Sequence, residues 1–321
     1  MKRELLISSF LAQPWALERT QLAALAGMLA RWHVDVPTPA ERVKIVAMED
    51  DDDPRERISA FEASRRQAQA RAGGSAIAVL PLYGTIVQRA NLATDICGGT
   101  STQQFTAAFR DAMADDTVGA ILIDIDSPGG SVYGTGELAD EIRAARGVKP
   151  VVAYANSLAA SAAYWVGSQA SEFYVTGGGE VGSIGVWQAH EDWSKALEDE
   201  GVKTTLISAG KFKVEGNPYQ PLDGDAQAFM QGRVDDYYAA FTGAVAKGRA
   251  VPVDQVRRGM GQGRVLGADA ALAEKMVDGI KTFDDVVRGM QRGLKQGGKG
   301  ASRLARARRR LDLDDEGESE G

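Results

Sequence analysis

Cysteine and histidine are nearly absent from this sequence of 321 residues, which contains one cysteine and two histidines. The single Cys97 excludes an internal disulfide framework and any metal site built from a cysteine cluster. His33 and His190 leave little room for a histidine-rich metal centre, and a Ser-His-Asp triad would depend on one of these residues. We therefore expect neither a metal ion nor an organic cofactor.

An excess of positive charge is also missing, because 37 Lys and Arg residues face 44 Asp and Glu residues, for a net charge of −7. This balance argues against a chain that binds nucleic acid with its whole surface. The uncharged stretch 150–171 is long enough to cross a bilayer, but it is rich in Ala and Ser and indicates a buried strand followed by a buried helix. The uncharged run 5–17 is interrupted by Pro14 and precedes no small-residue cleavage site. We expect no membrane anchor and a cytoplasmic location.

Composition divides the chain into three zones. Residues 1–74 are interpreted as a helical N-terminal extension that ends in an acidic linker. Residues 75–290 alternate strand-like and helix-like patterns and form the expected folded domain. Residues 291–321 place an arginine block, 303–310, beside an acidic end with almost nothing apolar to bury, so this tail is predicted to be disordered.

The middle zone predicts an α/β fold with a mostly parallel sheet covered by helices. Continuous apolar runs are typical of strands buried on both faces, and they occur at 76–80, 120–125, 150–154 and 172–176. Helical patterns lie between and after them, at 101–115, 134–145, 158–170, 187–200 and 224–246. This β-α-β-α order favours parallel strands joined by helical crossovers.

Four short segments could carry chemistry. The first, Asp126-Ser-Pro-Gly-Gly-Ser131, could turn backbone N–H groups toward a bound oxygen or form a plain tight turn. The second places Ser161 among alanines at a helix start, where it is either a reactive hydroxyl or one more small residue. The third is the glycine-bracketed turn 181–185, and the fourth is the polar loop 208–218, whose Lys213 would by default be a solvated charge.

In their order and spacing, these segments resemble the signal-peptide-peptidase A family of Ser–Lys proteases, which have a crotonase/Clp-protease-like fold. The resemblance covers about residues 76–288. It rests on four segments: 121–130, Ala-Ser-Ala-Ala-Tyr-Trp around Ser161, 182–186, and Gly210-Lys-Phe-Lys213. A motif that the family carries later in the chain is matched in part by Gly263-Arg264, Ala270 and Val277-Asp278. Asp126 departs from the family pattern, in which Asn is common, and Lys275-Met276 replace a usual Gly-Leu.

The resemblance implies acyl transfer by a Ser–Lys dyad. Ser161 would be the nucleophile and Lys213, 52 residues later, the general base. Such a lysine works only when neutral, which requires a dry site. Ser183 would orient the lysine amine, and main-chain N–H groups near Gly130 and residues 161–162 would bind the oxyanion. His190 is interpreted as a helix-entry residue without catalytic duty.

The setting implied by the resemblance is the head-maturation protease branch of phages, similar to minor capsid protein C. Such an enzyme would cut scaffold, capsid or portal proteins in the bacterial cytoplasm or the phage prohead. It would form a homo-oligomer, with a ring expected. The interface is expected on the apolar face of the helix at 224–246, which contains Phe229, Val234, Tyr237, Tyr238 and Phe241.

Alternatives remain open at this point. One is a soluble bacterial protease of the signal-peptide-peptidase type. A crotonase-type acyl-CoA enzyme would use the glycine-rich loop without needing Ser161 or Lys213. A structural capsid or scaffold-binding component would bind its partners equally well without these two residues. The arginine-rich tail could bind a protein partner or DNA, and its acidic end favours protein.

Overall fold

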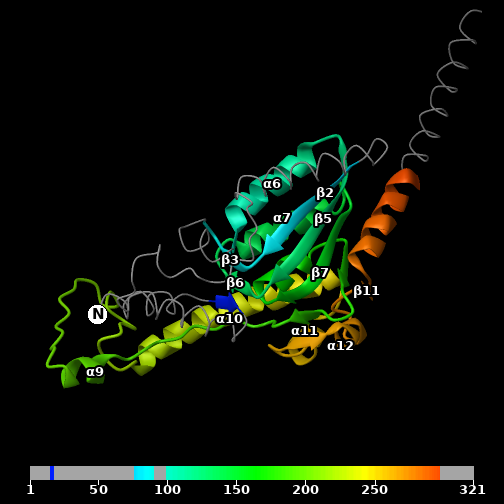
Figure 1. The fold of residues 1–321 in the computed structure, drawn as a ribbon. Helices are drawn as coiled ribbons and strands as arrows, with labels where there is room; N and C mark the ends of the chain where they lie inside the picture. Colours follow the sequence, from blue (N-terminus) through cyan, green and yellow to red (C-terminus); the bar gives the residue numbers. More distant parts are fainter. Residues whose placement is uncertain (1–14, 18–75, 90–98, 297–321) are drawn as a thin grey trace, which may run out of the picture.

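A seven-stranded sheet organises the residues that the structure, a computed structural model, describes: 15–17, 76–89 and 99–296 (Figure 1). Its strands are β2 (Ala76–Tyr83), β5 (Val118–Ser127), β7 (Val151–Ala160), β8 (Glu172–Val175), β9 (Glu180–Gly182), β10 (Val265–Gly267) and β11 (Gly279–Ile280). They follow the order β10-β9-β7-β5-β2, with β8 also beside β7 and β11 beside β8. All pairs are parallel except β10 with β9, which confirms the predicted mostly parallel sheet.

A second, smaller sheet lies at the carboxyl end of β5. It contains β1 (Trp15–Leu17), β3 (Thr85–Val87), β4 (Gly99–Ser101) and β6 (Gly129–Ser131), in the order β1-β6-β3-β4. Strand β3 is parallel to β4 and β6, whereas β1 is antiparallel to β6. Only Pro128 separates β5 from β6, so the chain passes directly from the large sheet into the small one.

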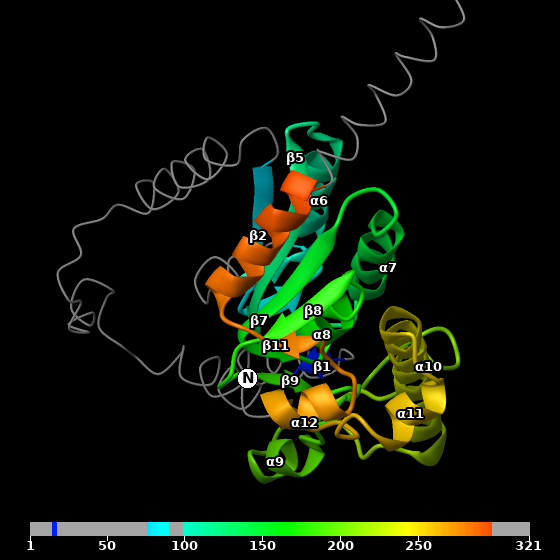
Figure 2. The ribbon, with the colours of Figure 1, turned by 90° about the vertical axis from the view of Figure 1, so that its right-hand side faces the viewer.

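Both faces of the large sheet are covered, as the apolar runs predict. On one face α6 (Thr102–Ala114), α7 (Thr135–Ala145) and α8 (Ala162–Gly167) pack over Ile121, Ile123 and Ile125. Gly167 lets α8 lie close to the sheet, because a Cβ there would be 2.9 Å from Ile125 Cδ1. On the other face the helix of residues 283–296 covers a cluster that includes Leu122 and Tyr154 (Figure 2).

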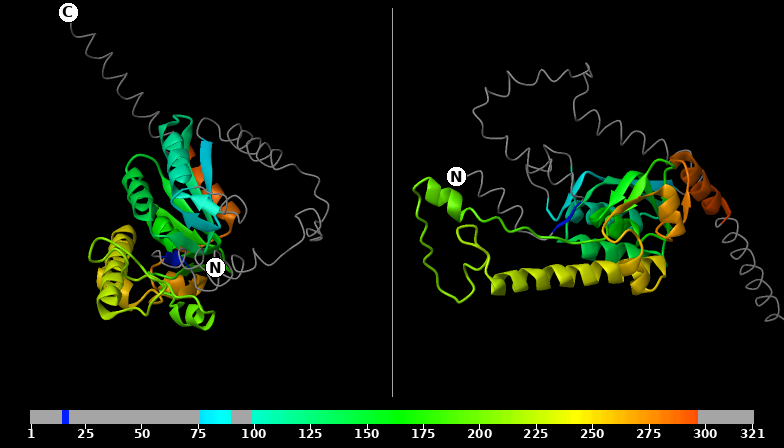
Figure 3. Two further views of the ribbon diagram at one scale, coloured as in Figure 1. Left: turned by 90° about the vertical axis from the view of Figure 1, so that its left-hand side faces the viewer. Right: turned by 90° about the horizontal axis from the view of Figure 1, so that it is seen from below.

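The long helix α10 (Gly224–Arg249) has a docked half and an extended half. Its C-terminal half packs on the core, where Phe241 stacks on Trp165 with ring centroids 4.6 Å apart and planes 7° from parallel. Its N-terminal half extends beyond the sheet together with α9 (Ser194–Asp199) (Figure 3). The expectation that Phe241 lies on an oligomer interface is therefore wrong, because this ring is buried within its own chain. Helices α11 (Val253–Arg258) and α12 (Ala268–Ala273) follow.

Two predicted helices are shorter than their sequence patterns suggest. The helix expected at 158–170 begins only at Ala162, because β7 continues to Ala160 and pairs there with β9. The helix expected at 187–200 is reduced to α9, and residues 187–193 form no helix. Small or polar residues in these stretches satisfy the local pattern of a helix, but strand pairing and loop contacts compete with it.

The termini are described only in part. Residues 291–296 continue the C-terminal helix, whereas the rest of the predicted tail lies outside the described residues. The acidic linker and most of the N-terminal extension also lie outside them, so the proposed domain limits stay predictions. In the part of the chain that the structure describes, no helix combines the length and apolar character needed to cross a membrane.

Candidate active site

Ser161 occupies a strained turn between a strand and a helix. It follows the last residue of β7 and caps α8, with φ 55° and ψ −118°. A residue with a side chain rarely adopts a positive φ, and such strain persists at functional sites where the surrounding structure holds it. Here the Ser161 N–H donates to Gly182 O at 2.7 Å, and Ser161 O accepts from Trp165 N at 2.9 Å. These two bonds fix the serine backbone at the junction.

The hydroxyl of Ser161 is buried and lacks a partner. The residue is 1% exposed, and its Oγ forms no hydrogen bond with any of the described residues. Buried polar atoms in folded proteins nearly always have a partner, and an orphaned one costs about 1–3 kcal/mol. A nucleophilic serine needs a hydroxyl that is free to bond to a general base, and the strained backbone of Ser161 presents such a hydroxyl.

Ser183 follows the end of β9 as Ser161 follows the end of β7. Gly182 pairs with Ala160 on one side and with Val265 on the other, so β9 connects β7 to β10. Ser183 also has a positive φ, 54°, and its N–H donates to Arg264 O at 2.8 Å. The Gly263-Arg264 segment therefore contacts the serine site directly, whereas the sequence pattern showed only that this segment comes late in the order of motifs.

Gly130 approaches the same place from β6. Ser127 pairs with Ala159 at the end of the β5–β7 ladder. Gly130 follows Ser127 by three residues in β6, which packs against α8, the helix that Ser161 caps. A Cβ on Gly130 would lie 1.9 Å from Ile86 O, and only glycine permits this approach of β6 to β3. The structure thus brings Gly130, Ser161 and Ser183 together at one end of the sheet.

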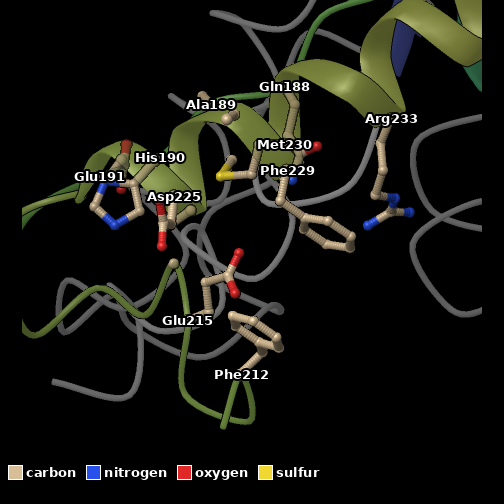
Figure 4. Close-up of a pocket in the computed structure, with 13 residues that line it drawn as sticks. Gln188, Ala189, His190, Glu191, Phe212, Glu215, Asp225, Phe229, Met230 and Arg233 are labelled. Carbon is tan, nitrogen blue, oxygen red and sulfur yellow. The ribbon is translucent and has the colours of Figure 1, made fainter.

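Lys213 does not reach Ser161 within one chain. It is exposed in the turn 211–216, and among the described residues its amine forms no hydrogen bond. The flanking Phe212 faces Phe229 and Met230 across a cavity of about 620 Å³ (Figure 4). Met230 lies eleven residues before Phe241 in α10, or about 16 Å along the helix axis. The Lys213 loop is therefore displaced along α10 from the point where the Ser161 helix packs.

His190 holds this loop rather than beginning a helix. Its Nε2 is 3.0 Å from Asn217 O, and the Asn217 side-chain amide donates to Val214 O at 2.6 Å. The Trp193 N–H donates to Pro218 O at 2.8 Å. Since α9 begins only at Ser194, the interpretation of His190 as a helix-entry residue is wrong. The sequence carries no pattern that predicts the contacts of His190 and Trp193 with this loop, because each joins residues more than twenty positions apart.

A polar cluster lies on the opposite face of the sheet. Asp124 accepts hydrogen bonds from the Tyr83 hydroxyl and, at 3.3 Å, from the Asn156 amide. Burial raises the pKa of Asp124 above its usual range, and these two bonds offset the effect only in part. Asp126 accepts a 2.5 Å bond from Ser157 Oγ, and alternation along β5 places its carboxylate on the face away from α8. No group of three or more His, Cys, Asp and Glu among the described residues could hold a metal ion.

Comparison with known proteins adds a family match and several relatives. The model of Peptidase family S49 matches residues 143–297. "Capsid assembly protease C" of Escherichia phage lambda is 38% identical over 226 residues, which are 68% of this chain and 49% of that protein. "Head-tail preconnector protein GP5" of Enterobacteria phage P21 is 37% identical over 205 residues, 63% of this chain and 41% of that protein. The chain spans about half the length of these curated relatives.

Among solved structures, a ClpP1 mutant from Listeria monocytogenes is similar in part. It has 16% sequence identity and a TM-score of 0.40, over 64% of this chain and 92% of that chain.

Proposed function

The match to Peptidase family S49 covers residues 143–297, and on that premise we propose that this chain is a serine endopeptidase with Ser161 as nucleophile and Lys213 as general base. The observation that carries the proposal is the buried, unpartnered Ser161 hydroxyl at a strained strand-to-helix turn. A serine used only for packing needs neither the strain nor the missing partner, since alanine would fill the space at lower cost.

The reaction divides peptide hydrolysis into two acyl transfers. Ser161 Oγ attacks the carbonyl carbon of the substrate, and its proton passes to the neutral Lys213 amine. Collapse of the tetrahedral intermediate breaks the C–N bond, and the lysine returns the proton to the leaving amine. Water, deprotonated by the same lysine, then releases the acyl group and regenerates the serine hydroxyl. Ser183 is the proposed partner that orients the lysine amine.

The oxyanion would be held by main-chain N–H groups from two segments. The Ser161 N–H is already used by Gly182 O, so it is not available as a donor. The Ala162 N–H, in the first turn of α8, has no carbonyl partner within the helix. Together with β6 around Gly130 it forms the proposed oxyanion hole, in which one donor is worth about 3 kcal/mol.

A second copy of the chain supplies Lys213 in this proposal. The lysine is exposed, and its loop, the residues before it and the facing part of α10 carry side chains that a monomer leaves open to water. Phe212, Phe229 and Ile207 are 58%, 62% and 96% exposed, although each is large and apolar. Covering them between copies would bury apolar area and bring a lysine to the unpartnered hydroxyl of a neighbour. We therefore propose a closed homo-oligomer with shared active sites.

Proteins of an assembling phage head are the proposed substrates. The similarity to proteins named "Capsid assembly protease C" and "Head-tail preconnector protein GP5" supports this class, which includes scaffold, capsid and portal proteins. The proposed places of action are the host cytoplasm and the prohead.

The decisive experiment traps the acyl-enzyme. A fluorophosphonate probe should label Ser161 of the oligomer, as located by mass spectrometry, and Ser161→Ala should abolish both labelling and peptide cleavage. Lys213→Ala should abolish cleavage, whereas Lys211→Ala, which removes a neighbouring exposed charge, should not. A label on Ser157 or Ser183 would refute the nucleophile, and full activity of Lys213→Ala would refute the base.

Shared sites are tested by mixing two inactive variants. After Ser161→Ala and Lys213→Ala chains exchange subunits, random pairing should restore about a quarter of the sites. Activity that stays at zero in mixed oligomers, or a fully active monomer by light scattering, would contradict the sharing of sites.

A further inference from the structure

Strand β6 has a partner on each edge, and one of them comes from the far N-terminal part of the chain. On one edge Gly130 pairs with Ile86 of β3. On the other edge β1 runs antiparallel, with Trp15 opposite Ser131, Ala16 opposite Gly130 and Leu17 opposite Gly129. All three residues of β6 are thereby paired with the segment Trp15–Leu17, which is separated from β2 by 58 residues of sequence.

The edge that β1 covers lies beside the proposed site. In the large sheet β5 lies between β2 and β7, and in the small sheet β6, which follows β5, lies between β3, which follows β2, and β1. The β1 edge of β6 is therefore on the β7 side, where Ser161 follows β7 and α8 packs against β6. A chain on this edge therefore lies about one strand spacing, 4.8 Å, from the β6 backbone that we propose as part of the oxyanion hole. Figure 1 shows β1 beside β6.

An extended polypeptide that binds through its backbone needs an unpaired strand edge. The opposite edge of β6 is closed permanently by β3, because Gly130 lies too close to Ile86 for another chain to enter. The β1 edge is the one that can open. Two strands cannot pair with it at once, so a peptide can use it only after Trp15–Leu17 leaves.

We infer that Trp15–Leu17 is an intramolecular competitor that occupies the β6 edge of the active site and restrains the protease until it is displaced. The inference rests on the proposed function, because only a peptidase has a substrate to exclude. Covalent connection to the domain gives the segment an effective concentration that a free peptide must exceed. Displacement of β1 then raises the apparent affinity for substrate without any change in the catalytic groups.

The test compares two double variants in the full chain. Ala16→Pro/Leu17→Pro removes the backbone N–H groups of residues 16 and 17. Whichever of these two groups donates a hydrogen bond to β6, that bond is lost. Ala16→Val/Leu17→Val is the matched control, since it alters the same side chains but keeps both N–H groups and suits a strand. Steady-state cleavage of a short reporter peptide is measured together with hydrogen exchange of the Gly129, Gly130 and Ser131 amides.

The proline variant should lower KM at least about threefold with kcat unchanged, and amide exchange in β6 should become faster. The valine variant should match the wild type in both readouts. A synthetic peptide of residues 10–22 should inhibit the proline variant competitively, whereas the same peptide with both prolines should not.

Equal KM and equal exchange in both variants would overturn the inference while the proposed function stands. If every form, the wild type included, fails to cleave peptides, the proposed function fails. Faster β6 exchange in the proline variant alone would then still establish that β1 covers this edge.

Discussion

Gly130→Ala tests the packing of β6 against β3 and its role in catalysis at the same time. The new Cβ would lie 1.9 Å from Ile86 O and 2.6 Å from both Ile86 N and Ile86 C. These are backbone atoms of a paired strand, so no side-chain rotation relieves the contact. Moving the oxygen contact from 1.9 Å to the 3.0 Å that real Cβ atoms respect requires a shift of about 1.1 Å between β6 and β3.

A displacement of about 1 Å at a reacting centre costs about 100-fold in rate, similar to the loss of one oxyanion donor. We expect kcat/KM of Gly130→Ala to fall at least 100-fold, equivalent to about 2.7 kcal/mol. The free energy of unfolding should fall by about 1–3 kcal/mol from overpacking. Activity is measured by peptide hydrolysis, at a temperature where circular dichroism shows the variant folded.

Gly243→Ala is the matched control. A Cβ at this position in α10 would meet nothing within 4 Å, and alanine stabilises a helix interior by about 0.5–1 kcal/mol relative to glycine. This variant should keep its activity and unfold at a slightly higher temperature. If Gly130→Ala retained more than a tenth of the wild-type kcat/KM, the tight β6–β3 approach would not position catalytic groups and the reasoning would fail.

Three other perturbations have expected outcomes. Phe241→Ala should reduce the free energy of unfolding by about 3–5 kcal/mol in thermal denaturation, because it empties a buried site and removes a stacked ring; a loss below 1 kcal/mol would contradict that packing. Burial raises the pKa of Asp278, but the Arg249 guanidinium and the Phe173 N–H hold it below its usual value. The ionised carboxylate therefore stabilises the folded state fully above the ordinary Asp pKa, and this stabilisation is lost as the pH falls through the lower pKa of the folded state. Asp278→Asn should cost about 1–2 kcal/mol at pH 7, discounted because the carboxylate is 38% exposed, and an unchanged acid-unfolding profile would refute it. The acylation rate should increase with pH if a lysine is the base, whereas a profile set by a group near pKa 6.5 and abolished by His190→Ala would restore a Ser-His mechanism.

The sequence alone determined the type of fold and the residues worth testing. The run 120–125 is apolar at every position except Asp124, which is the property of a strand covered on both faces, and β5 is such a strand. Burial is encoded locally in this way, so the parallel sheet and helices α6, α7 and α10 follow from pattern. The glycine pair before Ser131 and the small residues around Ser161 similarly mark places where backbones approach closely.

Tertiary structure decided the arrangement of the site. The left-handed backbone of Ser161 depends on a bond to Gly182, and that of Ser183 depends on a bond to Arg264, eighty-one residues later. The end of β7 is a strand instead of a helix because β9 pairs with it. Such outcomes depend on which distant strands meet, and no local pattern contains that information. The separation of Lys213 from Ser161 has the same origin, because it depends on how far along α10 its loop packs.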